Sequence, residues 1–153
     1  MSKEDNAQII IQKAFQDPIS ELLLNKSNLT KIQFETLVID LLTDLISDKK
    51  LSFTEKTLYR RTIVSRGAFS RTLGQARSNV ISAIYTIILL SYIGVLDSRP
   101  FEEYEILAEK LRDYISILKD SDGSHKKRQL KRIEAELLEG ITILSKPTRL
   151  KSL

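Results

Sequence analysis

Residues 66–92 constrain the fold more than any other part of the chain. A series of mostly apolar residues recurs along this stretch at intervals of 4, 3, 4, 4, 3 and 4 residues. The series is Phe69, Leu73, Ala76, Val80, Ile84, Ile87 and Ser91. An α-helix places residues three and four apart on one face. We therefore predict one long helix from residue 66 to about residue 92. Gly94 is the expected stop, because glycine readily adopts the backbone conformation that ends a helix.

The composition favours an all-helical protein with an ordinary core. Hydrophobic residues make up 42% of the 153 residues and charged residues 29%, so the chain has both a core and a solvated surface. Sheet-rich domains use more turn residues than the five glycines and three prolines found here. Cysteine is absent, which excludes disulfides, thiolate metal sites and a cysteine nucleophile. We predict an all-α fold.

Helices are also expected before the long one, at residues 4–16, 18–26, 31–47 and 53–61. Asp17-Pro18 separates the first two, with proline at the first helical position. Thr30 with Gln33 and Ser52 with Glu55 are capping-box patterns that open the next two. The helix at 31–47 carries one broad apolar stripe, which we expect to face the core: Phe34, Leu37, Val38, Leu41, Leu42 and Leu45.

The last third of the chain predicts an antiparallel helical hairpin. Apolar residues recur every three or four positions in residues 101–120 and again in 126–145, and "SDGS" interrupts them. Two such amphipathic helices joined by a short break pack against each other. The final residues, 146–153, are expected to be a frayed tail.

Positive charge is concentrated in two segments. Residues 52–79 hold six Lys or Arg and one acid, and "HKKRQLKR" at 125–132 holds five cations and no acid. Local patches of one sign attract polyanions. The cations of the second cluster are Lys126, Lys127, Arg128, Lys131 and Arg132. A phosphate-contacting patch and a solubilising helix start are equally good interpretations of this cluster.

The segment "VSRGAFSRTL", residues 64–73, combines small residues, hydroxyls and arginines at the start of the long helix. At about 100° per residue, Phe69, Leu73, Ala76 and Val80 define a buried side. Small residues opposite them would let the helix approach a duplex closely, and arginine and glutamine can each make paired bonds to a base edge. Six positions share this side as candidate base-facing residues: Gly67, Ser70, Arg71, Gly74, Gln75 and Ser78.

Further polar residues near this segment are candidates for phosphate contacts, which set affinity and register. They are Arg60, Arg61, Ser65, Arg66 and Arg77. The alternative is that these side chains are simply solvated, as arginines and serines on a polar helix face usually are.

Residues 58–73, "LYRRTIVSRGAFSRTL", resemble the helix-turn-helix motif of DNA-binding proteins. The resemblance implies that Val64 fills the core at the turn and that Ser65 caps the second helix. Phe69 and Leu73 would pack that helix on a partner at 53–61. The sequence departs from the usual pattern at Tyr59, where a small residue is typical, and at Ile63, where the turn glycine is typical.

These features together predict a DNA-binding protein with a helix-turn-helix domain at 1–96 and a hairpin at 97–145 for dimerisation or partner contact. The expected partners are double-stranded DNA and a second copy of the chain, because paired half-sites increase specificity. A transcriptional regulator or a chromosome-associated factor fits, in the cytoplasm. We expect no enzymatic activity, cofactor, metal or small-molecule substrate, since the lone His125 has no acid cluster or nucleophile near it.

Two other classes remain open. One is a helical protein–protein adaptor without nucleic-acid binding. The other is a membrane-peripheral helical protein using residues 80–96, which are apolar nearly all round. A membrane span needs about 20 apolar residues. This stretch is at the lower edge of that length and continues in phase from a basic segment, so a buried helix or a dimer interface is preferred.

Overall fold

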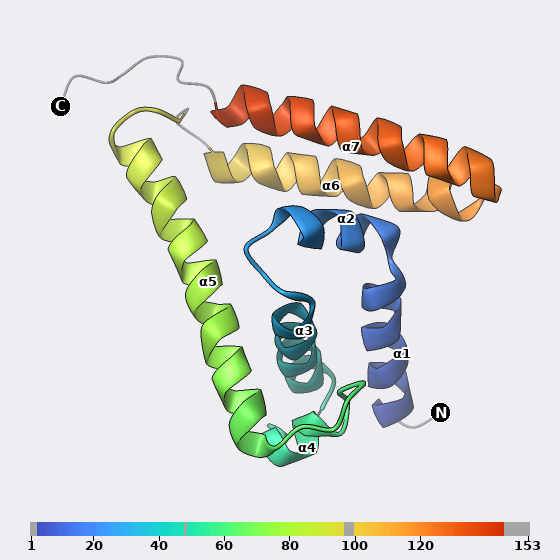
Figure 1. Ribbon diagram of the computed structural model, residues 1–153, viewed down its shortest axis with the longest axis vertical. Coiled ribbons are helices and arrows are strands. Elements are labelled where there is room, and N and C mark those ends of the chain that lie inside the picture. The colour runs from blue at the N-terminus through green and yellow to red at the C-terminus, as the bar shows by residue number, and fades with distance from the viewer. Residues whose placement is uncertain (1–2, 48, 97–99, 146–153) are drawn as a thin grey trace. The chain divides into compact units, whose positions relative to one another are not determined.

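The computed structural model describes residues 3–47, 49–96 and 100–145, and these form seven helices (Figure 1). The chain divides into two compact units, Met1–Ser82 and Ala83–Leu153. This division falls inside the long helix, whereas the sequence places a boundary at residue 97, which lies outside the described residues. The predicted tail at 146–153 also lies outside them. The all-α prediction is confirmed for the described residues.

The first unit contains α1 (Lys3–Gln16), α2 (Pro18–Lys26), α3 (Lys31–Ile46), α4 (Phe53–Thr57) and the first part of α5 (Arg66–Tyr92). The predicted starts of these helices are confirmed by their caps. Asp17 accepts the backbone N–H groups of Ile19 and Ser20 at the start of α2. Both capping boxes form, at the starts of α3 and α4. Each such cap stabilises a helix by about 1 kcal/mol.

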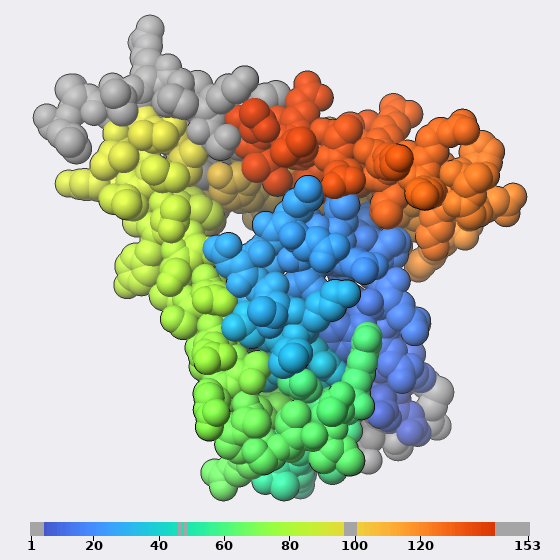
Figure 2. Space-filling model, in the orientation of Figure 1, coloured from blue at the N-terminus to red at the C-terminus, as the bar shows by residue number. Residues whose placement is uncertain are grey.

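The core of the first unit lies where α1, α3 and α5 meet. Its fully buried members are Ile11, Ile39, Phe69 and Leu73. Val64 packs against this cluster from the segment before α5, as the helix-turn-helix resemblance implies. Figure 2 shows the same unit from outside, with the green side chains of α5 adjoining the blue ones that precede α3.

The predicted helix at 53–61 is wrong in length. α4 ends at Thr57, and the next residues form tight turns in which the N–H groups of Leu58, Tyr59 and Arg60 bond three residues back. An irregular segment of residues 58–65 then leads to α5, longer than the three- or four-residue turn usual in this motif. Phe69 nevertheless packs on α4, with its ring centroid 5.8 Å from that of Phe53.

Helix α5 has the predicted bounds and the predicted stop. Gly94 has φ 78°, and the N–H of Val95 donates to the carbonyl of Leu90 at 2.9 Å. The predicted buried side is only partly correct, since Val80 is 39% exposed. The amide of Asn79 already donates to the carbonyl of Asn28 in the loop before α3, at 3.0 Å.

The second unit contains the end of α5 and the predicted hairpin, formed by α6 (Pro100–Lys119) and α7 (Gly123–Ser145). Leu111 and Leu118 of α6 are buried with Ile133 and Leu137 of α7. Polar pairs along the seam fix the direction of the helices, and they are Tyr114 with Glu136 at 2.6 Å and Ser121 with Gln129 at 2.7 Å. Tyr114 of α6 bonds the later α7 residue, and Ser121 in the turn after α6 bonds the earlier one, so the helices are antiparallel.

Candidate nucleic-acid interface

The six predicted base-facing residues of α5 lie together on one exposed face. All of them are exposed, and Phe69, Leu73 and Ala76 on the opposite side are buried. A Cβ added at Gly67 or Gly74 would meet no atom within 4 Å, so this face is open. Glycine and serine keep the helix narrow here, and the long side chains of Arg71 and Gln75 project between them.

Ser65 caps this helix as predicted. Its hydroxyl accepts the N–H of Ala68 at 3.1 Å, and its carbonyl accepts the N–H of Phe69 at 3.0 Å. A capped helix start leaves N–H groups of the first turn directed outward, where they attract anions. Arg66, the first residue of α5, is also exposed. The helix start therefore combines a cation with the positive end of the helix dipole.

Arg60 does not lie where the phosphate prediction needs it. Its side chain is only 5% exposed, with Nε 3.4 Å from Oε2 of Glu35. Its Nη1 donates to the hydroxyl of Thr36 at 2.7 Å. Burial is favoured because Glu35 supplies the opposite charge, and a buried guanidinium needs such a partner. We therefore remove Arg60 from the candidate interface.

Arg61 is also turned toward the protein. Its guanidinium carbon lies 4.7 Å from the centre of the Phe15 ring, in a cation–π contact with α1. Its backbone N–H donates to Oε1 of Glu35 at 2.9 Å. Glu35 thus holds both Arg60 and Arg61, and it fixes the segment between α4 and α5 on α3.

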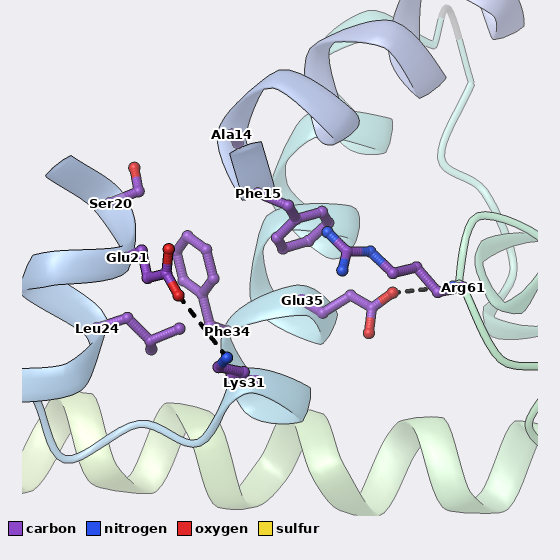
Figure 3. Close-up of a pocket in the computed structure, with 9 residues that line it drawn as sticks. All are labelled: Ala14, Phe15, Ser20, Glu21, Leu24, Lys31, Phe34, Glu35 and Arg61. Carbon is purple, nitrogen blue, oxygen red and sulfur yellow. Dashed lines mark hydrogen bonds and ion pairs between the residues drawn. The ribbon is translucent and has the colours of Figure 1, made fainter. Parts of the chain in front are cut away.

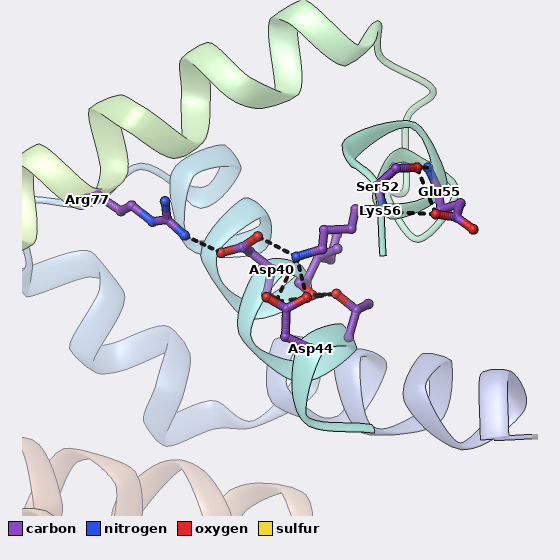
Figure 4. A network of polar contacts seen from close by, with 8 residues as sticks. Asp40, Asp44, Ser52, Glu55, Lys56 and Arg77 are labelled. Carbon is purple, nitrogen blue, oxygen red and sulfur yellow. Dashed lines mark hydrogen bonds and ion pairs between the residues drawn. The ribbon is translucent and has the colours of Figure 1, made fainter. Parts of the chain in front are cut away.

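Asp40 of α3 joins two cations from two different helices (Figure 4). Nζ of Lys56 donates to Oδ1 at 2.7 Å, and Nη2 of Arg77 donates to Oδ2 at 2.7 Å. Nζ of Lys56 also lies 2.6 Å from Oδ1 of Asp44. Arg77 remains 57% exposed, so this network anchors it beside the open face of α5 without covering it.

Lys56 is almost fully buried and still charged. Burial alone would lower the pKa of its ammonium group, but hydrogen bonds to Asp40 and Asp44, with their negative charge, raise the pKa above its ordinary value. The charged form is thus retained inside the unit. Sequence reasoning treated Lys56 as part of a positive surface and missed this network.

The second basic patch lies on α7 in the second unit. All five of its cations are exposed, and Nε of Arg132 bonds Oε1 of Glu136 at 3.1 Å. Glu136 also accepts the hydroxyl of Tyr114, and these two bonds hold the pKa of its carboxyl below the ordinary value. The other four cations sit in the first turns of α7, on a surface free to meet an anion.

Among the described residues, no group of three or more His, Asp or Glu side chains is placed to hold a metal ion. One helix of the described chain, α5, is long and apolar enough to cross a membrane, a property that core helices of soluble proteins share.

No family model, no curated protein and no solved structure matches the chain. Its function is therefore inferred from its own geometry and charge.

Proposed function

We propose that this chain binds double-stranded DNA through the exposed face of the first half of α5. The observation that carries the proposal is the clustering of six small or hydrogen-bonding residues on one open helix face. That face is held by the buried side chains of Phe69, Leu73 and Ala76. A helix presented in this way enters a major groove, where Arg71 reads a guanine edge and Gln75 an adenine edge.

The phosphate contacts are assigned to residues flanking this face. Ser65 and Arg66 lie at the start of α5, and Arg77 lies three turns on, anchored by Asp40. Arg60 is buried against Glu35, and the guanidinium of Arg61 lies over the Phe15 ring of α1, so neither is assigned as a phosphate contact. The remaining contacts position the helix and supply affinity without reading sequence.

The affinity for a random-sequence duplex should depend clearly on salt. Each neutralised phosphate contributes about −0.9 to the slope of log K against log salt. Arg66 contributes about −1 to this slope, and Arg77 contributes at most about −1 more. We therefore expect a slope of about −1 to −2 per subunit. Fluorescence anisotropy with a labelled duplex at several salt concentrations measures this slope. A flat response would contradict DNA binding, because no other source of general affinity is assigned.

We also propose that the protein is a homodimer that pairs two half-sites, as a transcriptional regulator or chromosome-associated factor. Large apolar side chains of the second unit are exposed on every helix, among them Ile88, Tyr92, Ile106 and Leu138. Such surface usually marks an association site. Sedimentation equilibrium at micromolar concentration should give twice the chain mass. A monomer would remove the two-half-site arrangement and leave single-site binding.

Association with a membrane is the second candidate, and the length and apolar character of α5 favour it. The two proposals differ in what the protein requires in solution. A DNA-binding protein should purify without detergent and bind a duplex in that form. Precipitation without detergent, with recovery on lipid vesicles, would support the membrane candidate.

A further inference from the structure

A small cavity in the first unit lies between α1, α2 and α3, with the segment 58–65 closing one side (Figure 3). Its volume is about 200 Å³. Phe15 and Phe34 form an apolar wall, with ring centroids 5.6 Å apart in an edge-to-face arrangement. Ala14 and Leu24 add further apolar surface. Apolar pockets with a few polar groups are the usual form of small-molecule sites, and this one is smaller than those for drug-sized ligands.

The charges around the cavity leave one cation without a counter-charge. Glu35 is paired with the buried Arg60, and Glu21 faces Lys31 with Oε1 3.9 Å from Nζ. Arg61 has only the Phe15 ring as a partner for its guanidinium. Within the described part of the chain, its guanidinium N–H groups meet no acceptor, although its backbone N–H is bonded to Glu35. The lining holds two acids and two cations, and the Arg61 guanidinium is the one charged group among them that has no carboxylate partner in the described residues.

The orientation of Arg61 determines which anion fits. A guanidinium stacked on a ring keeps its N–H donors free at the edge of its plane. That edge matches the two oxygens of a carboxylate, which accept a pair of parallel bonds. The apolar wall beside it then covers the rest of the ligand.

We infer that this cavity binds a small monocarboxylate with an apolar, ring-sized body. The carboxylate pairs with Arg61, and the body packs against Phe15 and Phe34. The site is separate from the open face of α5 and does not depend on DNA binding.

Benzoate is the probe, and benzamide is its neutral match of nearly the same shape. Titration of the full chain, followed by amide chemical shifts, should show benzoate saturating at Ala14 and Phe34. Benzamide should bind about tenfold more weakly or worse, since it lacks the charge that Arg61 recognises. Equal binding of the two probes, or shifts that avoid the cavity, would overturn the inference.

Two variants and a control assign the site. Arg61→Gln should weaken benzoate binding about tenfold or more. Ala14→Met, which fills the cavity while keeping a good helix former, should abolish binding even if the guanidinium is intact. Arg66→Gln removes an exposed arginine away from the cavity and should leave benzoate affinity unchanged. Helix content is checked for each variant. Wild-type affinity in Arg61→Gln or in Ala14→Met contradicts the inference.

Discussion

Replacing Asp40 with alanine should lower the free energy of unfolding by about 3 kcal/mol. Asp40 is 3% exposed and accepts hydrogen bonds from both Lys56 and Arg77. Its loss leaves the buried ammonium group of Lys56 with one carboxylate partner instead of two. Breaking a buried ion pair costs about 3–5 kcal/mol, and the lower end applies because Asp44 remains with Lys56. Urea unfolding followed by circular dichroism measures the loss.

Lys31→Ala is the matched control for this prediction. Lys31 and Glu21 form an exposed pair, with side chains 76% and 62% exposed, and exposed pairs contribute less than about 1 kcal/mol. If Asp40→Ala unfolds the chain outright, Asp40→Asn keeps the shape and should still be less stable than Lys31→Ala. Equal stability of the Asp40 and Lys31 variants would mean that the buried network contributes little.

The network shows where sequence reasoning about α3 was wrong. The predicted core stripe is correct for Leu37, Val38 and Leu42, which are partly buried and pack against the core cluster, but Leu41 and Leu45 are 60% and 80% exposed. The most buried positions of α3 are instead Thr36, Ile39, Asp40 and Thr43, with Glu35 beside them. Threonines at 36 and 43 bond carbonyls four residues back within the helix, which satisfies their hydroxyls in the interior.

The reason for this error is that the partners of the buried face come from distant parts of the chain. Lys56 is 16 residues from Asp40, and Arg77 is 37 residues from it. A stripe of apolar residues is a local signal in the sequence. Which face of α3 is buried depends also on Lys56 and Arg77, which come from later helices. The spacing of Thr36, Asp40 and Thr43 on one side, together with Ile39, was the signal available in the sequence.

The helix starts could be predicted because their chemistry is local. The side chain of Thr30 accepts the N–H of Gln33, and that of Ser65 accepts the N–H of Ala68, each within three residues. The exposed face of α5 was predictable for the same reason. The helical spacing of Phe69 and Leu73 identifies the buried side, and the exposed face lies opposite. The positions of Arg60 and Arg61 were not, because they depend on Glu35 and Phe15 far away in the sequence.

Arg71→Ala should cost about 1–3 kcal/mol in binding to a preferred duplex and little on random DNA. Arg71 projects from the open face of α5 between Gly67 and Gly74, opposite the buried Leu73. A residue at this position contacts bases if the face enters a groove. The preferred duplex is obtained first by selection from a randomised library with the wild-type chain.

Arg66→Ala is the comparison variant. Arg66 lies at the start of the same helix and is exposed, but it is placed for a phosphate. Its loss should weaken all sequences about equally and reduce the size of the salt slope by about 1. Both variants must keep the helix content and mass of the wild type, so that a loss of binding reports contact and not folding.

The ratio of the dissociation constants for random and selected duplexes tests the central claim most directly. It is measured at one salt concentration for the wild type, Arg71→Ala and Arg66→Ala. The proposed groove contact predicts that the ratio falls about fivefold or more in Arg71→Ala and stays near the wild-type value in Arg66→Ala. An unchanged ratio in Arg71→Ala would contradict the claim, and the open face of α5 would then be a solvated surface or a protein–protein contact.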